Sequence, residues 1–259
     1  MLCSRVNVLG LFGRFTHSFP RSLHTQTSRL HTPKTSCPID LSLYLVADRK
    51  SVTSDEEFFS KVSRAVKGGV SCVQLRDHGR PTDAILKTAR QLKHILAAEG
   101  VPLIINTRID IALAVSAEGI YFEQYHKSFL HSARFALTPQ TSIGIPVHVP
   151  EEVLVAEHLA VNYLSVKIFP SKRTNPEDNQ VWGLEGLEKL RSLTDHRIVA
   201  IGGITLENLA QVCQRLRLKE DGTGDGVAMV GDLWRTDDTS EIAAKVRSVM
   251  QTFSCHHKA

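Results

Sequence analysis

Two adjacent glycines in this sequence follow an apolar run and could bind an anion. Residues 198–201 are continuously apolar, and Gly202 and Gly203 come directly after them. Because glycine has no Cβ, backbone N–H groups in such a turn can approach an anion closely, and a helix that begins at Thr205 would add its dipole. The pattern predicts a phosphate-binding turn. The alternative is a tight strand-to-helix turn without a ligand.

A histidine after another apolar run could move a proton. His148 follows residues 143–147 and precedes Pro150, where a helix is predicted to begin. An imidazole has an unperturbed pKa of about 6.5, which suits general acid/base chemistry near neutral pH. His148 is therefore the candidate catalytic residue. The alternative is a histidine that only packs at a helix start.

Three polar residues at the ends of two predicted strands could contact a substrate. Gln74 and Arg76 lie two positions apart, so they share one face of a strand, and Asn106 ends the next apolar run. A long polar loop, residues 169–182, carries Lys172 and is predicted to cover an anionic substrate. A solvated loop without a ligand is the alternative.

Eight apolar runs alternate with amphipathic segments and must position these residues. The runs are residues 43–46, 72–75, 103–105, 119–122, 143–147, 163–168, 198–201 and 226–230. Ser54 and Glu57 form a capping box before the first helix, whereas the segment after the fourth run has no clear period. The pattern predicts a single (β/α)8 TIM barrel preceded by a disordered N-terminal leader, with an open doubly wound sheet as the alternative.

The barrel prediction explains where the candidate residues fall. Active sites of such barrels lie at the carboxyl ends of the strands, and phosphate often binds after the seventh and eighth strands. Gly202 and Gly203 follow the seventh run, Val230 ends the eighth, and Gly231 follows it. These four residues are therefore predicted to hold a phosphate group.

The first 39 residues differ in composition from the rest. They contain five of the 31 basic residues and none of the 27 acidic ones, and Ser and Thr are frequent. This composition is typical of a transit peptide, so residues 1–39 are predicted to be a disordered mitochondrial leader, with plastid or cytoplasmic localisation as alternatives. Residues 40–254 then form the barrel, and residues 255–259 form a tail.

Charge, apolar runs and cysteines exclude several function classes. Without the leader the chain is nearly neutral, so its basic sequence pI does not indicate a nucleic-acid partner, and no apolar run is long enough for a membrane partner. Cys72, Cys213 and Cys255 show no CxxC pairing and are predicted to be reduced thiols. No metal-binding motif is present, and no cofactor is expected.

Several motifs in order resemble the thiamine phosphate synthase and TenI family. They are VQLR at residues 73–76, NTRIDIAL at 106–113, the segment from Gly144 through His148 to Glu151 and Glu152, AIGGIT at 200–205, and residues 226–230. The resemblance covers essentially residues 41–253. It implies a barrel that acts on thiamine-related phosphates.

Two departures from the family pattern favour one of its branches. In the synthases an aspartate after the strand-three Asn and another after strand four hold Mg²⁺ on a diphosphate; here Thr107 and His126 occupy these positions. Neither side chain replaces a carboxylate for a hard cation. The resemblance therefore implies a TenI-like thiazole tautomerase in thiamine biosynthesis, an isomerase that transfers a proton through His148.

Alternatives remain open at this point. They are a thiamine phosphate synthase, for which Mg²⁺ would be the cofactor, and a catalytically degenerate barrel that binds thiazole or thiamine phosphates. The expected partner in each case is a phosphorylated thiazole or thiamine-related small molecule, and a homo-oligomer is left open.

A shortened chain tests the prediction for the leader. A protein beginning at Pro38 should melt at the same temperature as the full chain, because the leader has no periodic apolar face to bury. A melting midpoint several degrees lower for the shortened protein would show that residues 1–37 contribute to the fold.

Overall fold

A computed structural model describes residues 39–170, 180–236 and 238–254 of the chain. Eight parallel strands form a closed barrel in sequence order. They are β1 (Leu43–Asp48), β2 (Cys72–Arg76), β3 (Leu103–Asn106), β4 (Gly119–Tyr121), β5 (Ser142–Pro146), β6 (Tyr163–Lys167), β7 (Arg197–Ile201) and β8 (Gly226–Met229). Because β8 pairs with β1, with Leu43 opposite Val227, the predicted barrel is confirmed and the open sheet is wrong.

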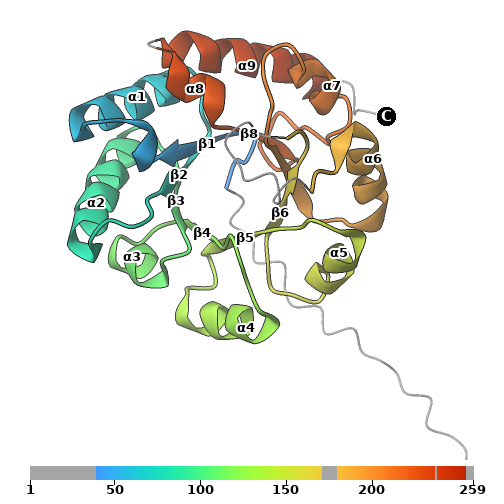
Figure 1. Cartoon of the computed structure of the whole chain (residues 1–259), viewed down its shortest axis with the longest axis horizontal. Helices are drawn as coiled ribbons and strands as arrows, with labels where there is room; N and C mark the ends of the chain where they lie inside the picture. Colours follow the sequence, from blue (N-terminus) through green and yellow to red (C-terminus); the bar gives the residue numbers. More distant parts are fainter. Residues whose placement is uncertain (1–38, 171–179, 237, 255–259) are drawn as a thin grey trace, which may run out of the picture. The chain divides into compact units, whose positions relative to one another are not determined.

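Helices surround this barrel (Figure 1). They are the 3-10 helix η1 (Arg49–Ser51) and α1 (Asp55–Lys67), α2 (Thr82–Ala98), α3 (Ile109–Ala114), α4 (Lys127–Ala136), α5 (Pro150–Ala156), α6 (Gly183–Leu193), α7 (Leu209–Cys213), α8 (Gly231–Arg235) and α9 (Thr239–Ser254). The Ser54 hydroxyl accepts a hydrogen bond from the Glu57 N–H, so the predicted cap of α1 is confirmed. Within the described residues, none of the helices has the length and apolar character needed to cross a membrane.

The core has two layers. The larger one lies between the strands and the helices and includes Leu45, Val73 and Phe58. The smaller one fills the barrel and includes Tyr44 and Tyr163. Alternate residues of each strand supply the two layers, because successive side chains of a strand point to opposite faces.

Three elements differ from the prediction. The segment after the fourth run forms α4, whose period is obscured because Phe129 and Phe135 are exposed although apolar. The helix expected from Thr205 begins only at Leu209, because the Asn208 side chain bonds the Thr205 N–H and the Gly203 carbonyl and closes a turn first. The residues after β8 form a short helix, α8, which was not predicted.

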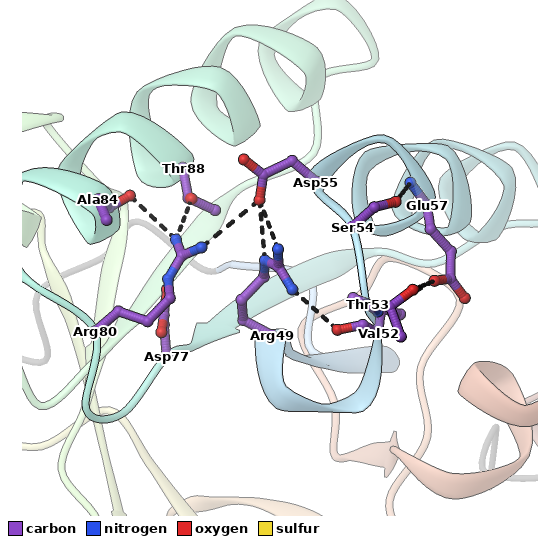
Figure 2. Close-up of polar contacts among 10 residues, drawn as sticks. All are labelled: Arg49, Val52, Thr53, Ser54, Asp55, Glu57, Asp77, Arg80, Ala84 and Thr88. Carbon is purple, nitrogen blue, oxygen red and sulfur yellow. Dashed lines mark hydrogen bonds and ion pairs between the residues drawn. The ribbon is translucent and has the colours of Figure 1, made fainter.

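Ion pairs join the loops that follow β1 and β2 (Figure 2). Asp55 Oδ1 lies 2.8 Å from Arg49 Nη2 and 3.6 Å from Arg80 Nη1. Arg80 also donates from Nε to the buried carboxylate of Asp77 at 2.9 Å and from Nη2 to Thr88. These arginines therefore serve the structure of the rim, and each is already neutralised by an aspartate.

Arg197 closes the opposite end of the barrel. Its guanidinium donates to the carbonyls of Ile39, Gly222 and Gly224. Ile39, which the sequence analysis placed at the end of the leader, is buried in the inner layer of the core. Residues 1–38 and 255–259 lie outside the described part of the chain, so the predicted leader and tail stay predictions.

The two free thiols in the described residues are both buried. Cys72 and Cys213 have no disulfide partner, as expected, and burial raises the pKa of the Cys213 thiol to about 12. Both therefore stay protonated near neutral pH. Cys255 lies outside the described residues.

A glycine of β5 provides a test of the inner core. A Cβ at Gly144 would lie 2.1 Å from Cζ of the fully buried Tyr163 ring, so Gly144→Ala should lower the free energy of unfolding by about 2 kcal/mol. Gly186→Ala is the matched control, because Gly186 lies within α6 and its Cβ would meet only Trp182, at 3.1 Å. Urea unfolding of both variants measures the difference. Equal stabilities would show that the inner core tolerates the added methyl group.

Candidate active site

A buried hydrogen-bond chain runs from the barrel interior to the rim at the carboxyl ends of the strands. The Tyr44 hydroxyl donates to Gln74 Oε1 at 2.9 Å, and Gln74 Nε2 donates to Asn106 Oδ1 at 2.9 Å. Burial raises the pKa of Tyr44 well above its usual value, so its hydroxyl stays protonated and can donate. Gln74 and Asn106 are 4% and 5% exposed. Gln74 thus orients Asn106 and lies beneath the rim.

Four side chains meet at the end of this chain and are called the rim cluster: Arg76, His78, Asn106 and Glu123. Asn106 Nδ2 lies 3.1 Å from His78 Nε2. Glu123 Oε2 lies 3.2 Å from the same nitrogen, and Glu123 Oε1 lies 3.0 Å from Arg76 Nε. The last residues of β2 and β3 and the loops after β2 and β4 therefore bring three nitrogen-bearing groups and one carboxylate together.

The candidate residues of the sequence analysis did not include His78 and Glu123. The alternation of Gln74, Arg76 and His78 was a usable signal for His78, because every second residue of a strand faces the same side. Glu123 is the first charged residue after the fourth apolar run. Its contacts with Arg76 and His78 become visible only in the folded barrel, because these residues are far from Glu123 in the sequence.

A hollow of about 470 Å³ adjoins the rim cluster and is called the β4–β5 hollow. Its wall includes Glu123, Tyr125, His126, His148, Glu151 and Glu152. The backbone N–H of His148 donates to Glu152 Oε2 at 2.6 Å, and the ring Nδ1 lies 3.2 Å from the same oxygen. Glu152 thus holds a half-exposed imidazole at this wall. Glu123 belongs both to the hollow and to the rim cluster.

The two glycines after β7 have φ angles of +86° and +61°, which favour glycine. A Cβ at Gly203 would lie 2.6 Å from Phe169 Cβ, and one at Gly202 would lie 2.9 Å from Lys167 Cγ. Close packing against the segment after β6 therefore requires both glycines. Because α7 begins at Leu209, the predicted contribution of a helix beginning at Thr205 is wrong.

The other residues predicted to bind phosphate are Val230, Gly231 and Lys172. Val230 follows β8, and Gly231 is the first residue of the five-residue helix α8. Lys172 lies outside the described residues. Phosphate binding by the glycines, Val230, Gly231 and Lys172 stays a prediction.

The side chains at the rim do not fit a magnesium site held by the protein. Thr107 and His126 offer a hydroxyl and an imidazole, whereas Mg²⁺ prefers carboxylates. Both oxygens of Glu123 already face Arg76 and His78. In the parts of the chain that the structure describes, no group of three His, Cys, Asp or Glu side chains could hold a metal ion.

Comparison with known proteins adds information on the family. Residues 43–233 match a family model described as thiamine monophosphate synthase. The chain is 37% identical over 210 residues to a protein of Albidiferax ferrireducens named thiamine-phosphate synthase, with 81% of this chain and 92% of that protein covered. A protein of the same name from Syntrophomonas wolfei is 38% identical over 212 residues, with coverages of 82% and 97%.

A solved structure agrees with these relatives. Thiamine phosphate pyrophosphorylase from Pyrococcus furiosus superposes with a TM-score of 0.70 at 27% sequence identity, covering 83% of this chain and 98% of that one. The fold and the sequence thus point to the same group of proteins.

The predicted branch and activity are wrong. The curated relatives carry the name of the synthase, a transferase, and none of those compared supports a TenI-like thiazole tautomerase or an isomerase. Because the tautomerase activity is wrong, the proton transfer through His148 that belonged to that reaction is wrong as well. The departures at Thr107 and His126 do not outweigh the similarity of the whole barrel to the synthases.

The unsuitable donor set leads to a prediction for magnesium. Calorimetric titration of Mg²⁺ into the ligand-free protein should show no binding with micromolar affinity, because the rim carboxylate is paired with the cationic guanidinium of Arg76. A stoichiometric heat that Glu123→Gln or Asn106→Ala abolishes would contradict it. Calcium serves as the second titrant, because it accepts a wider range of oxygen ligands.

Proposed function

We propose that this chain, which belongs to the thiamine monophosphate synthase family, is a thiamine-phosphate synthase. It would join a phosphorylated thiazole to a pyrimidine diphosphate and release inorganic diphosphate. The observation that carries the proposal is the similarity to proteins of that name over almost their entire length. The thiamine-related partner expected from the sequence is consistent with it.

The chemistry assigns a task to the rim cluster. The thiazole nitrogen forms a bond to the methylene carbon of the pyrimidine, and the bond from that carbon to the diphosphate oxygen breaks. Negative charge then develops on the leaving diphosphate, and hydrogen-bond donors fixed in advance lower the barrier most. Arg76 and the Asn106 amide are the donors that the rim offers, and His78 joins them when its Nε2 carries a hydrogen.

The β4–β5 hollow suits the ring end of the substrates. Its volume of about 470 Å³ is within the usual range of a small-molecule site. Glu123, Glu151 and Glu152 line it, and their charge favours the cationic thiazolium ring of the product over a phosphate group. We assign His148 a contact with this ring, with Glu152 holding the imidazole in place.

Localisation in mitochondria is a further proposal. It rests on the basic, Ser- and Thr-rich composition of the leader, of which residues 1–38 lie outside the described part of the chain. Plastid and cytoplasmic localisation are the alternatives. Fluorescence microscopy of the leader fused to a reporter distinguishes the three.

The synthase proposal is tested by product formation. The purified protein, given a hydroxymethylpyrimidine diphosphate, a hydroxyethylthiazole phosphate and Mg²⁺, should release thiamine phosphate and diphosphate in equal amounts, measured by mass spectrometry and a coupled diphosphate assay. Arg76→Gln should lower kcat/KM about 100-fold, because it removes a charged donor to the leaving group. Arg108→Gln is the control, since Arg108 is paired with Asp110 on the next loop of the rim.

Two results would contradict the proposal. One is the absence of product from the wild-type protein at saturating substrates while ligand binding remains measurable, which would identify a binding protein. The other is an equal loss of activity in both arginine variants.

A further inference from the structure

The carboxylate of Glu123 contacts two basic side chains of the rim, Arg76 and His78. One carboxylate oxygen faces Arg76 at 3.0 Å and the other faces His78 at 3.2 Å. Two oxygens of one phosphoryl group can span the Arg76 guanidinium and an Nε2-protonated His78 ring in the same manner. The carboxylate therefore lies where an anionic group of a substrate would meet Arg76 and His78.

The contacts of Glu123 are weak enough to be exchanged. The side chains of Arg76, His78 and Glu123 are 39%, 42% and 35% exposed. Ion pairs with this exposure contribute little to stability, because water screens them and long side chains lose rotamer freedom. A diphosphate carries more charge and more acceptor oxygens than a carboxylate, so it can displace Glu123 from both partners.

The opposite side of the rim cluster provides space for the displaced side chain. Glu123 also lines the β4–β5 hollow, together with His126 and His148. A rotation about its side-chain bonds would carry the carboxylate from Arg76 and His78 into that hollow. Asn106, which is held from below by Gln74, stays in place as a donor.

We propose that Glu123 is an internal competitor at the anion subsite formed by Arg76, His78 and Asn106, and that the diphosphate group of the substrate binds by displacing it. The identification of the ligand as a diphosphate rests on the proposed function; the competition itself rests on the contacts of Glu123. Glu123 thereby sets the affinity of the rim for polyanions.

Calorimetry with inorganic diphosphate, in the presence of a chelator, tests the competition without turnover. Glu123→Gln keeps the shape of the side chain and removes its charge, so the variant should bind diphosphate about tenfold more tightly than the wild type. Asp110→Asn is the matched control, because it also releases an exposed rim arginine, Arg108, and should leave the affinity unchanged. Thermal melts verify that each variant is folded.

A double variant shows whether the gain in diphosphate affinity depends on Arg76. In Glu123→Gln/Arg76→Gln the tenfold gain should disappear, since the released guanidinium is absent. In the synthase assay, Glu123→Gln should lower KM for the pyrimidine diphosphate, whereas kcat changes less than KM. A purely structural role for Glu123 would not produce this division between KM and kcat.

The outcomes separate the competition from the synthase activity. Equal diphosphate affinity of wild type and Glu123→Gln, an equal gain in Asp110→Asn, or no diphosphate binding by either protein would overturn the competition. Tighter diphosphate binding by Glu123→Gln in a protein without synthase activity would support the competition and contradict the proposed function.

Discussion

The candidate site depends on the need of two buried amides for hydrogen-bond partners. Gln74 and Asn106 are almost completely excluded from water, and an unpaired amide in such a place costs about 1–3 kcal/mol. The Tyr44 hydroxyl satisfies Gln74, and Gln74 satisfies Asn106. This sequence of bonds links β1, β2 and β3 inside the barrel and directs the remaining amide hydrogens of Asn106 to the rim. The positions of His78 and then Glu123 follow from that direction.

Much of the fold was predictable because its strands are buried on both faces. A strand such as β7 is largely a continuous apolar run, and eight such runs separated by helical segments favour a closed barrel over an open sheet, as the structure has it. The prediction missed α4, where exposed phenylalanines mask the period, and misplaced the start of α7, where a single asparagine side chain stabilises a turn. Local side-chain contacts of this kind override periodicity and leave no repeated signal in a sequence.

The site was predictable only in part, because some of its contacts join residues that lie far apart in the sequence. Gln74, Arg76 and Asn106 end predicted strands, and their spacing alone indicates the face on which they lie. Glu123 pairs with Arg76 across the mouth of the barrel, although the two residues are 47 positions apart in the chain. No pattern within either segment predicts that contact. Thr107 and His126, taken as isolated donors, indicate the wrong activity. A charged mouth can be balanced in more than one way, and here guanidinium, imidazole and carboxylate balance one another.

The pairing of β1 with β8 also constrains how the chain can be made. Strands β2 to β7 pair only with neighbours close to them in sequence, whereas one edge of β1 finds its partner only in residues 227–229, near the end of the described chain. During synthesis from the amino terminus, that edge presents unpaired N–H and carbonyl groups until almost the whole protein has left the ribosome. An exposed edge of an apolar strand is a template for pairing with other chains. The growing polypeptide therefore keeps this edge of β1 exposed until β8 has been made, and closure of the barrel removes the edge.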